Sequence, residues 1–406
     1  MARPVSARAR YVAVLRAPHV LRLVLASLLA RLPMGIEGLA VVLYLSQARD
    51  SFAVAGLVSG GLALGTAAGA PLQSRLIDRL GQHAVLLPAA IGNAAAIVAL
   101  VGFTELGAPA LVLALIGVVA GLTTANVSSA MRTLWPEVMG GREHLVPTAF
   151  ALDSVAIELL FTTGPLLTAV VVSLVSPAAA LGLAALLGLV GTIAFVAQPP
   201  SRHWRPHPDA GSHGPLGALR SGGVRTLMVA TAPVGFGFGA VEITLPAFAG
   251  EHGAPELGGV LLATWALASA TGGLLYGARS WGRSLHRTYV GLAALLPLGF
   301  LPALAAPNIP LMAILILPAG LAIAPLLAAG NQLAGQVAPP GAVTEAYTWP
   351  ITSLIAGFAA GAAVGGVLIE AVDWRAALLS AFVAASLGAA LAYARRHTLA
   401  AALAPA

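Results

Sequence analysis

Five ionisable residues interrupt stretches of the sequence that are otherwise long and apolar: Arg31, Glu37, Asp153, Glu158 and Glu242. An ionisable group at bilayer depth is costly, so such residues are candidates for function. A carboxylic acid that faces each side of a membrane in turn can bind a proton on one side and release it on the other. The four carboxylates are therefore candidates for proton coupling.

The one arginine of this set needs a counter-charge. At a rise of 1.5 Å per residue, Arg31 and Glu158 fall near the middle of their apolar stretches, so we expect a buried ion pair between them. Such a pair could instead only cross-link two helices, or Arg31 could bind an anionic substrate. Glu37 and Glu242 fall nearer one end of their stretches, and their alternative role is to reach the membrane surface.

A second group of charges is packed into one short segment, SRLIDRLGQH (Ser74–His83), in a chain with only 9% charged residues. An aspartate at a helix end can accept hydrogen bonds from the N-terminus of a neighbouring helix and pair with an arginine. We expect Asp78 to close a gate in this way, with Arg79 or Arg132 as its partner and Gly81 in the turn. The alternative is an ordinary charged turn that fixes the orientation of the chain.

Membrane-spanning helices must position these residues. The chain of 406 residues is 58% hydrophobic, with a mean hydropathy of +0.90. A spanning helix needs about 20 mostly apolar residues. The apolar stretches do not alternate with period two, which excludes a membrane barrel. We count twelve candidate spans, at residues 20–46, 51–73, 83–103, 108–130, 146–174, 178–198, 224–249, 257–278, 287–305, 309–333, 344–368 and 374–394.

The distribution of arginines sets the expected orientation. Basic residues gather before the first span and after the even-numbered spans, so the positive-inside rule places both termini in the cytoplasm. The net charge of +6 is thus a topology signal, and no nucleic-acid partner is needed. The richness in alanine, glycine and proline, with no lysine, indicates a bacterial gene and hence the bacterial cytoplasmic membrane.

The chain divides into two similar halves. Residues 1–198 and 224–406 each hold six spans, and the polar segment 199–223 reads as a flexible cytoplasmic linker. The segment Thr148–Pro165 aligns with Glu345–Ala362, which pairs Gly164 with Gly361. The stretches around Glu37 and Glu242 are also similar. We therefore predict an all-α polytopic membrane protein in which twelve transmembrane helices form two pseudo-symmetric six-helix bundles.

The segment around Asp78 resembles the signature loop of the major facilitator superfamily, with the pattern G-x-L-a-D-R-x-G-R-R. Leu76, Asp78, Arg79 and Gly81 fall on this pattern, whereas Ser74 replaces its first glycine and Gln82 and His83 its last basic pair. The second copy, after the eighth span, keeps Gly282 and Arg283 but has Arg279 where the aspartate would stand. The resemblance implies alternating access by two rocking bundles around a central site. It also implies a cavity lined by spans 1, 4, 7 and 10.

Further polar and aromatic side chains inside the spans are candidates for the substrate cavity. The resemblance places Asn126 and Asn331 there, and the other candidates are Arg31, Gln332, Trp265 and Trp349. Hydrogen bonds between helices are the alternative role for the amides. Glycines recur at four-residue spacing in spans 2, 8 and 11, which suits either sliding between the halves or static helix packing. The Gly164–Ala169 stretch resembles part of a glycine–proline element of proton antiporters of the superfamily.

These observations favour a secondary active transporter over other classes. The sequence holds no cysteine, no H-E-x-x-H, no G-x-S-x-G and no phosphate-binding loop, so we expect neither an enzyme nor a metal site nor a cofactor. We expect proton-coupled efflux of a small amphipathic molecule by a monomer. A proton-coupled importer or a sugar or metabolite exchanger of the same fold is the alternative, and an integral membrane enzyme is a remote one.

Overall fold

A computed structural model gives the arrangement of the chain. It describes residues 7–206, 214–254, 257–279 and 284–400, and over these ranges the secondary structure is helical. Twelve of the helical segments are long and apolar enough to cross a membrane. Most predicted spans are confirmed to within a few residues, and the fifth and twelfth coincide with the helices Val146–Leu174 and Trp374–Ala394.

The first half of the chain supplies six of the spans, and kinks divide the first and the fourth of them into two helices. Its elements, in chain order, are α1 (Ala7–Leu15), α2 (Val20–Arg31), α3 (Pro33–Ala48), α4 (Phe52–Leu80), α5 (Gln82–Glu105), α6 (Ala110–Thr123), α7 (Val127–Val138), η1 (Glu143–Leu145), α8 (Val146–Leu174) and α9 (Pro177–Val196).

The connection and the second half follow. Their elements are α10 (Pro199–Arg202), η2 (Gly214–Arg220), α11 (Gly222–Glu251), α12 (Gly258–Gly277), α13 (Leu285–Phe300), η4 (Pro302–Ala305), α14 (Ile309–Leu315), α15 (Leu317–Val337), α16 (Val343–Ala371), α17 (Trp374–Ala394) and α18 (Arg396–Ala400). Residues 207–213 of the predicted linker and 280–283 of the second signature segment lie outside the described residues.

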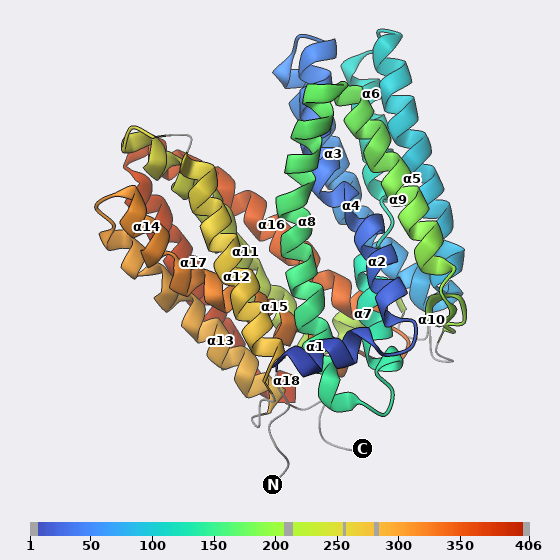
Figure 1. Cartoon of the computed structure of the whole chain (residues 1–406), viewed down its shortest axis with the longest axis vertical. Helices are drawn as coiled ribbons and strands as arrows, with labels where there is room; N and C mark the ends of the chain where they lie inside the picture. Colours follow the sequence, from blue (N-terminus) through green and yellow to red (C-terminus); the bar gives the residue numbers. More distant parts are fainter. Residues whose placement is uncertain (1–6, 207–213, 255–256, 280–283, 401–406) are drawn as a thin grey trace.

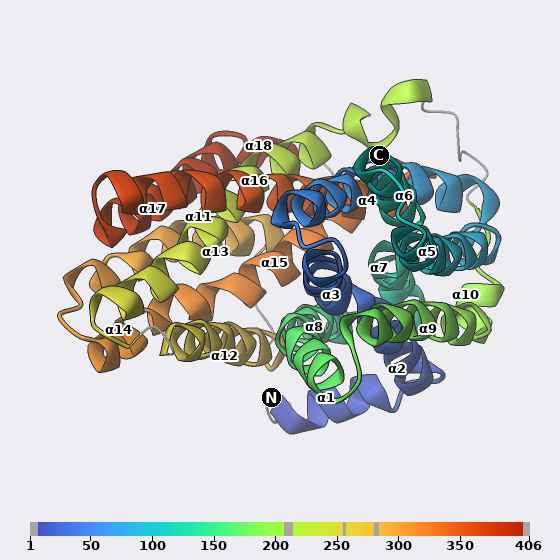
Figure 2. The same ribbon diagram turned by 90° about the horizontal axis from the view of Figure 1, so that it is seen from above.

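The helices form two bundles that meet at one end and diverge toward the other (Figure 1). We call the end where α1, α10 and α18 lie the base. Seen from above, α4, α7 and α8 of the first bundle face α12, α15 and α16 of the second (Figure 2). We call this contact between the bundles the seam. One apolar core runs from the base of the first bundle through the length of the second bundle, and a second core is confined to the first bundle.

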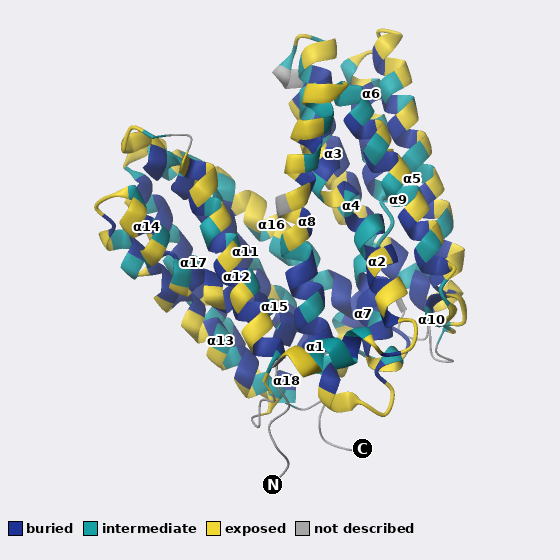
Figure 3. Cartoon of the chain, in the orientation of Figure 1, coloured by how far each residue is buried: buried dark blue, intermediate teal, exposed yellow. Residues whose placement is uncertain are grey.

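The outer faces of the bundles are apolar, as a bilayer requires. Figure 3 shows exposed residues along the outer helices, and large aliphatic side chains are among them, such as Val98 of α5 at 68% exposure and Val383 of α17 at 58%. In water such a surface would be unfavourable, whereas in lipid it has no cost. The chain is therefore a multi-pass membrane protein.

The glycine repeats mostly serve packing inside each bundle. A Cβ atom at Gly65 would lie 2.1 Å from the carbonyl oxygen of Val118, and one at Gly361 would lie 1.9 Å from that of Phe236. These glycines let α4 approach α6 and let α16 approach α11. Only Gly273 and Gly277, of the glycines in these repeats, face the other bundle. The aligned glycines Gly164 and Gly361 each pack on the first span of their own half, Gly164 against Gly35 and Gly361 against Phe236.

One predicted loop is wrong. The segment Ser74–Leu80 does not lie in a loop between spans but forms the last two turns of α4. The connection to α5 is the single residue Gly81, whose φ of 93° is a conformation that favours glycine. The prediction failed because the apolar run ends before the helix does, and a helix leaving the membrane core can continue with charged residues.

Candidate functional site

The candidate site is a buried polar layer at the seam, close to the base. Three helices build it, and residues four apart on each helix share a face. We call it the seam cluster, and its members are Ser74, Arg75 and Asp78 of α4, Asn126 just before α7, Ser129 and Thr133 of α7, and Thr344, Glu345 and Thr348 of α16.

Asp78 closes the N-terminus of a helix in the other bundle. Its two carboxylate oxygens accept hydrogen bonds from the backbone N–H groups of Thr344 and Glu345, each at 3.0 Å. The first N–H groups of a helix have no partner within the helix, and the residue at the start of α16, Ala342, provides no side-chain cap. Asp78 thus supplies a cap from outside, and its negative charge suits the positive end of the helix.

The Glu345 carboxylate accepts hydrogen bonds from α4, from α16 itself and from η2. One carboxylate oxygen accepts from the Arg75 guanidinium at 2.6 Å and from the indole N–H of Trp349 at 3.0 Å. The other accepts from the backbone N–H of Ala218 at 3.2 Å, in the connection between the halves. The carboxylate is buried, so these donors and the guanidinium charge are what compensate it there.

Hydroxyl and amide groups fill the layer between these charges. The Thr348 hydroxyl contacts the hydroxyls of Ser74 and Ser129, the latter at 2.7 Å. The Asn126 side-chain amide donates to Ser74 at 2.8 Å and to Thr348 at 3.2 Å. Asn126 holds this position because it lies at the break between α6 and α7, where its side-chain oxygen also caps α7 through the N–H of Ser129.

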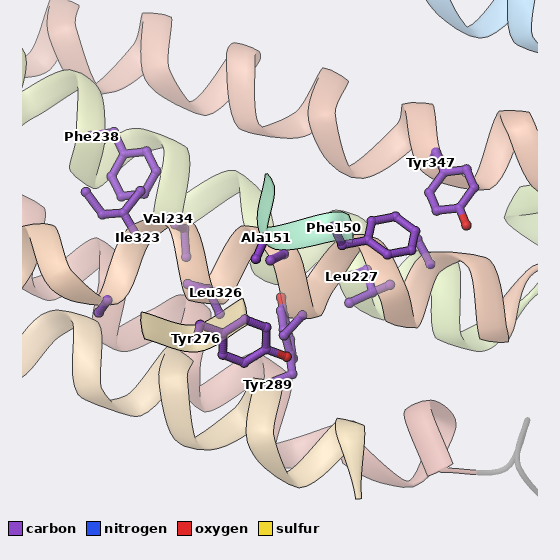
Figure 4. Packing of buried hydrophobic residues seen from close by; sticks show 14 of the residues in the cluster. Phe150, Ala151, Leu227, Val234, Phe238, Tyr276, Tyr289, Ile323, Leu326 and Tyr347 are labelled. Carbon is purple, nitrogen blue, oxygen red and sulfur yellow. The ribbon is translucent and has the colours of Figure 1, made fainter. Parts of the chain in front are cut away.

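A second line of contacts joins α8 and α12. The Thr148 hydroxyl donates to the carbonyl of Gly277 at 2.6 Å, and the hydroxyl of Ser269 donates to Glu158 at 2.8 Å. Between them Phe150 of α8 enters the core of the second bundle (Figure 4). Its ring centroid lies 6.0 Å from that of Tyr347.

A buried ion cluster holds the first bundle together. Arg31 of α2 and Arg132 of α7 bind opposite oxygens of the Asp153 carboxylate, at 2.8 and 3.2 Å. Arg31 also donates to the carbonyl and hydroxyl of Ser27. The predicted Arg31–Glu158 pair is therefore wrong, because Asp153 faces α2 whereas Glu158 faces α12. Protonation of Asp153 would leave two guanidinium charges buried without a counter-charge, so its contacts fit a cross-link better than a proton carrier.

The predicted gate residues have different positions. Asp78 reaches the other bundle as expected, but it binds a helix N-terminus instead of Arg79 or Arg132. Arg79 is exposed, and Arg132 belongs to the ion cluster. Gly81 follows the last residue of α4, and a Cβ atom there would lie 3.7 Å from the carbonyl oxygen of Trp204 in the connection between the halves.

The other candidates for proton coupling lie apart from the seam cluster. Glu37 is 5% exposed inside the first bundle, and its Oε1 has no hydrogen-bond partner among the described residues. Glu242 is half-buried in α11. Glu158 accepts a hydrogen bond from the other bundle, through Ser269 of α12.

The predicted cavity residues are dispersed. Trp349 binds Glu345 in the seam, and Trp265 packs edge-on against Phe238 with ring centroids 5.9 Å apart. Asn331 and Gln332 are buried in α15. Gln332 also lines a cavity of about 720 Å³ at the base, whose other walls include Asp78, Tyr347 and Trp204. Among the described residues, no group of three or more His, Asp or Glu side chains is arranged to hold a metal ion.

Most of the seam cluster was not predicted from the sequence. Arg75, Ser129, Thr133, Thr344 and Thr348 were not singled out, although the spacing of four residues in Ser74–Asp78, Ser129–Thr133 and Thr344–Thr348 is a helical-face signal. Short polar side chains at that spacing in three separate apolar helices indicate a shared polar surface.

Comparisons with known proteins agree with this architecture. Residues 23–298, more than half of the chain, match the protein family described as the Major Facilitator Superfamily. None of the curated proteins compared with the chain matches it.

Several solved structures share the fold. A bacterial homologue of the iron transporter ferroportin in an outward-facing state has a TM-score of 0.73 at 14% identity, over 92% of this chain and 98% of that one. FucP in the outward conformation has a TM-score of 0.67 at 15% identity, over 94% of this chain and 99% of that one. The human organic anion transporter MFSD10 has a TM-score of 0.66 at 19% identity, over 95% of this chain and 99% of that one.

Proposed function

The chain belongs to the Major Facilitator Superfamily, and from this premise we propose that it exports a small amphipathic molecule by proton-coupled alternating access. Membership makes it a membrane transporter rather than an enzyme. The substrate, the direction and the coupling ion are the proposed part. We propose further that it works as a monomer in the bacterial cytoplasmic membrane, with the base in the cytoplasm.

The proposed state of the structure is outward-facing. The observation that carries the proposal is the capping of α16 by Asp78, because it joins the two bundles at the base and must break before the base can open. Residues 1–198 and 224–406 are proposed to rock as two bodies about the central site. The arginine-rich base supports its cytoplasmic placement, because positive loops remain inside.

Proton coupling is proposed to use Glu158, Glu37 and Glu242. Glu158 is the best placed of the three, because its partner Ser269 belongs to the other bundle and rocking changes its surroundings. A buried carboxylate that loses its donor and meets water in the next state can exchange a proton between the two sides. Asp153 is proposed as a structural cross-link instead.

The proposal is tested by accumulation of a panel of antibiotics, dyes and sugars in cells that produce the protein, with and without a protonophore. Lower accumulation that the protonophore abolishes supports proton-driven export. Higher accumulation that the protonophore abolishes would establish a proton symporter, as FucP of Escherichia coli is described to be, and would overturn the export direction.

The gate is tested in the same cells by Asp78→Asn, which keeps one acceptor oxygen but removes the charge. We expect slower transport and greater labelling of the base from the cytoplasm. Asp50→Asn is the matched control, because Asp50 is exposed in the loop before α4, away from the base. Unchanged transport and unchanged labelling of Asp78→Asn would contradict the role of Asp78.

A further inference from the structure

The seam has two sets of contacts: α4 and α7 meet α16, and α8 meets α12. The two sets are not equivalent. Asp78 caps the start of α16, but the repeated segment after α12 has Arg279 at the corresponding position. An arginine has no acceptor atom, so it cannot bind the N–H groups at the start of a helix. The arrangement made by Asp78 with α16 is therefore not repeated between the end of α12 and the start of α8.

The first helix of the chain occupies this place. α1 lies across the base beside α8 and reaches the end of α12, which belongs to the other bundle (Figures 1 and 2). The Tyr11 hydroxyl donates to the carbonyl of Leu274 at 2.9 Å and lies 3.4 Å from that of Gly273. With Thr148 on Gly277, two side chains of the first bundle donate to carbonyls in the last turn of α12, and the Leu274 carbonyl also accepts from the backbone N–H of Ala278.

The glycine at position 277 leaves room for the contact between Tyr11 and α12. A Cβ atom at Gly277 would lie 2.3 Å from the Tyr11 hydroxyl oxygen and 2.6 Å from the Cβ of Ala151. Glycine at this position thus allows α1 and α8 to approach α12 together. Burial raises the pKa of Tyr11 to about 12, so its hydroxyl remains a donor at any physiological pH.

We infer that Tyr11 is a positioning residue of the transport cycle, which holds the base closed by binding the C-terminal turn of α12. This contact replaces the capping carboxylate that the second signature segment lacks. The inference rests on the proposed function, because it requires the base to open. α1 otherwise packs on α2, α8 and η1 of its own bundle, so it would move with them and leave Leu274 as the base opens.

The test measures the distance between two spin labels, one on each side of the contact between α8 and α12, in the full chain in lipid nanodiscs. Spin labels are attached to the exposed positions of Arg142→Cys and Arg279→Cys, which are unambiguous because the chain has no cysteine of its own. Tyr11→Phe removes only the hydroxyl, and we expect it to raise the ratio of open to closed populations by roughly two- to tenfold, the effect of one net hydrogen bond. Tyr393→Phe, at a side chain that is 58% exposed in α17, is the control and should change nothing.

A second variant tests whether the contact depends on close packing at Gly277. Gly277→Ala places a methyl group against Tyr11 and Ala151 and is expected to populate longer distances. Gly259→Ala adds a methyl group to the same helix where no atom lies within 4 Å, and should not. Unchanged distances in both Tyr11→Phe and Gly277→Ala would overturn the inference.

The same labels separate this inference from the proposed function. If Asp78→Asn lengthens the distances and Tyr11→Phe does not, the role of Tyr11 is refuted and alternating access stands. If the distances never change, in any variant or with any transported compound, alternating access is refuted and the inference with it.

Discussion

Arg75 and Glu345 form an ion pair of 2.6 Å between the two bundles, and the two partners are buried to different degrees. The Arg75 side chain is 30% exposed, whereas that of Glu345 is 2% exposed. Solvent can therefore stabilise the arginine after the pair breaks, but not the glutamate while the base is closed.

The first prediction follows from this asymmetry. Arg75→Met leaves a buried carboxylate without its counter-charge, and we expect it to destabilise the closed base by about 1–2 kcal/mol. Glu345→Gln leaves an arginine near water, and the one oxygen of the new side chain can still accept from Arg75 and Trp349. It loses the 3.2 Å hydrogen bond from Ala218, so it should cost less, about 1 kcal/mol. The double variant should be closer to the parent than Arg75→Met alone.

Labelling of the base from the cytoplasm, at a cysteine introduced near α10, measures all three variants. Arg225→Met is the control, because Arg225 is exposed at the same end of the molecule. If labelling increases more in Glu345→Gln than in Arg75→Met, the buried carboxylate does not determine the free-energy cost of breaking the ion pair.

The second prediction concerns the ion cluster of the first bundle. Asp153→Asn leaves Arg31 and Arg132 buried without a counter-charge, so we expect a loss of about 3–5 kcal/mol in unfolding free energy. Thermal unfolding of the purified protein in detergent measures the loss, with Asp50→Asn as control. Normal stability combined with lost proton coupling would instead make Asp153 a proton carrier.

The third prediction separates the two roles of Glu158. Glutamine can still accept the hydrogen bond from Ser269 but cannot carry a proton. We therefore expect Glu158→Gln to bind substrate as the parent does while its transport no longer depends on the proton gradient. Counterflow, which needs no gradient, should persist. Ser269→Ala keeps the carboxylate and should retain coupling. Full proton dependence in Glu158→Gln would exclude Glu158 as the carrier.

The fourth prediction tests static packing by the glycine repeats. Gly65→Ala places a methyl group 2.1 Å from a backbone oxygen of α6 and should cost about 1–3 kcal/mol of stability. Gly60→Ala, in the same helix with no atom within 4 Å, should be neutral or stabilising by up to about 1 kcal/mol. Equal melting temperatures for the two variants would contradict the close approach of α4 and α6.

The spans were predictable because they rest on local composition, and the two-bundle fold because the two halves of the sequence are similar. The fifth span, at residues 146–174, was predicted with its ends, since the bilayer requires long apolar runs and polar residues flank them. Asp78 was predicted as a contact residue because a helix N-terminus attracts a carboxylate.

Partners of buried charges were not predictable in the same way. Asp153 and Glu158 are five residues apart, so on a helix their side chains point about 140° from each other. Only the rotation of α8 against its neighbours decides which of them meets Arg31, and that rotation is set by packing over the whole bundle. The same limit applies to Glu345, whose partners come from α4 and from the connection between the halves.

The contacts of Asp78, Thr148 and Tyr11 share a feature that bears on how this protein can change over generations. All three bind backbone groups at helix ends. Every residue has a backbone carbonyl, and every residue except proline has a backbone N–H. Side chains at positions such as Leu274 are therefore free to vary without weakening these bonds. Proline at position 344 or 345 is the exception. The two bundles can thus diverge in sequence, and acquire new cargo, while the means of holding them together remains the same.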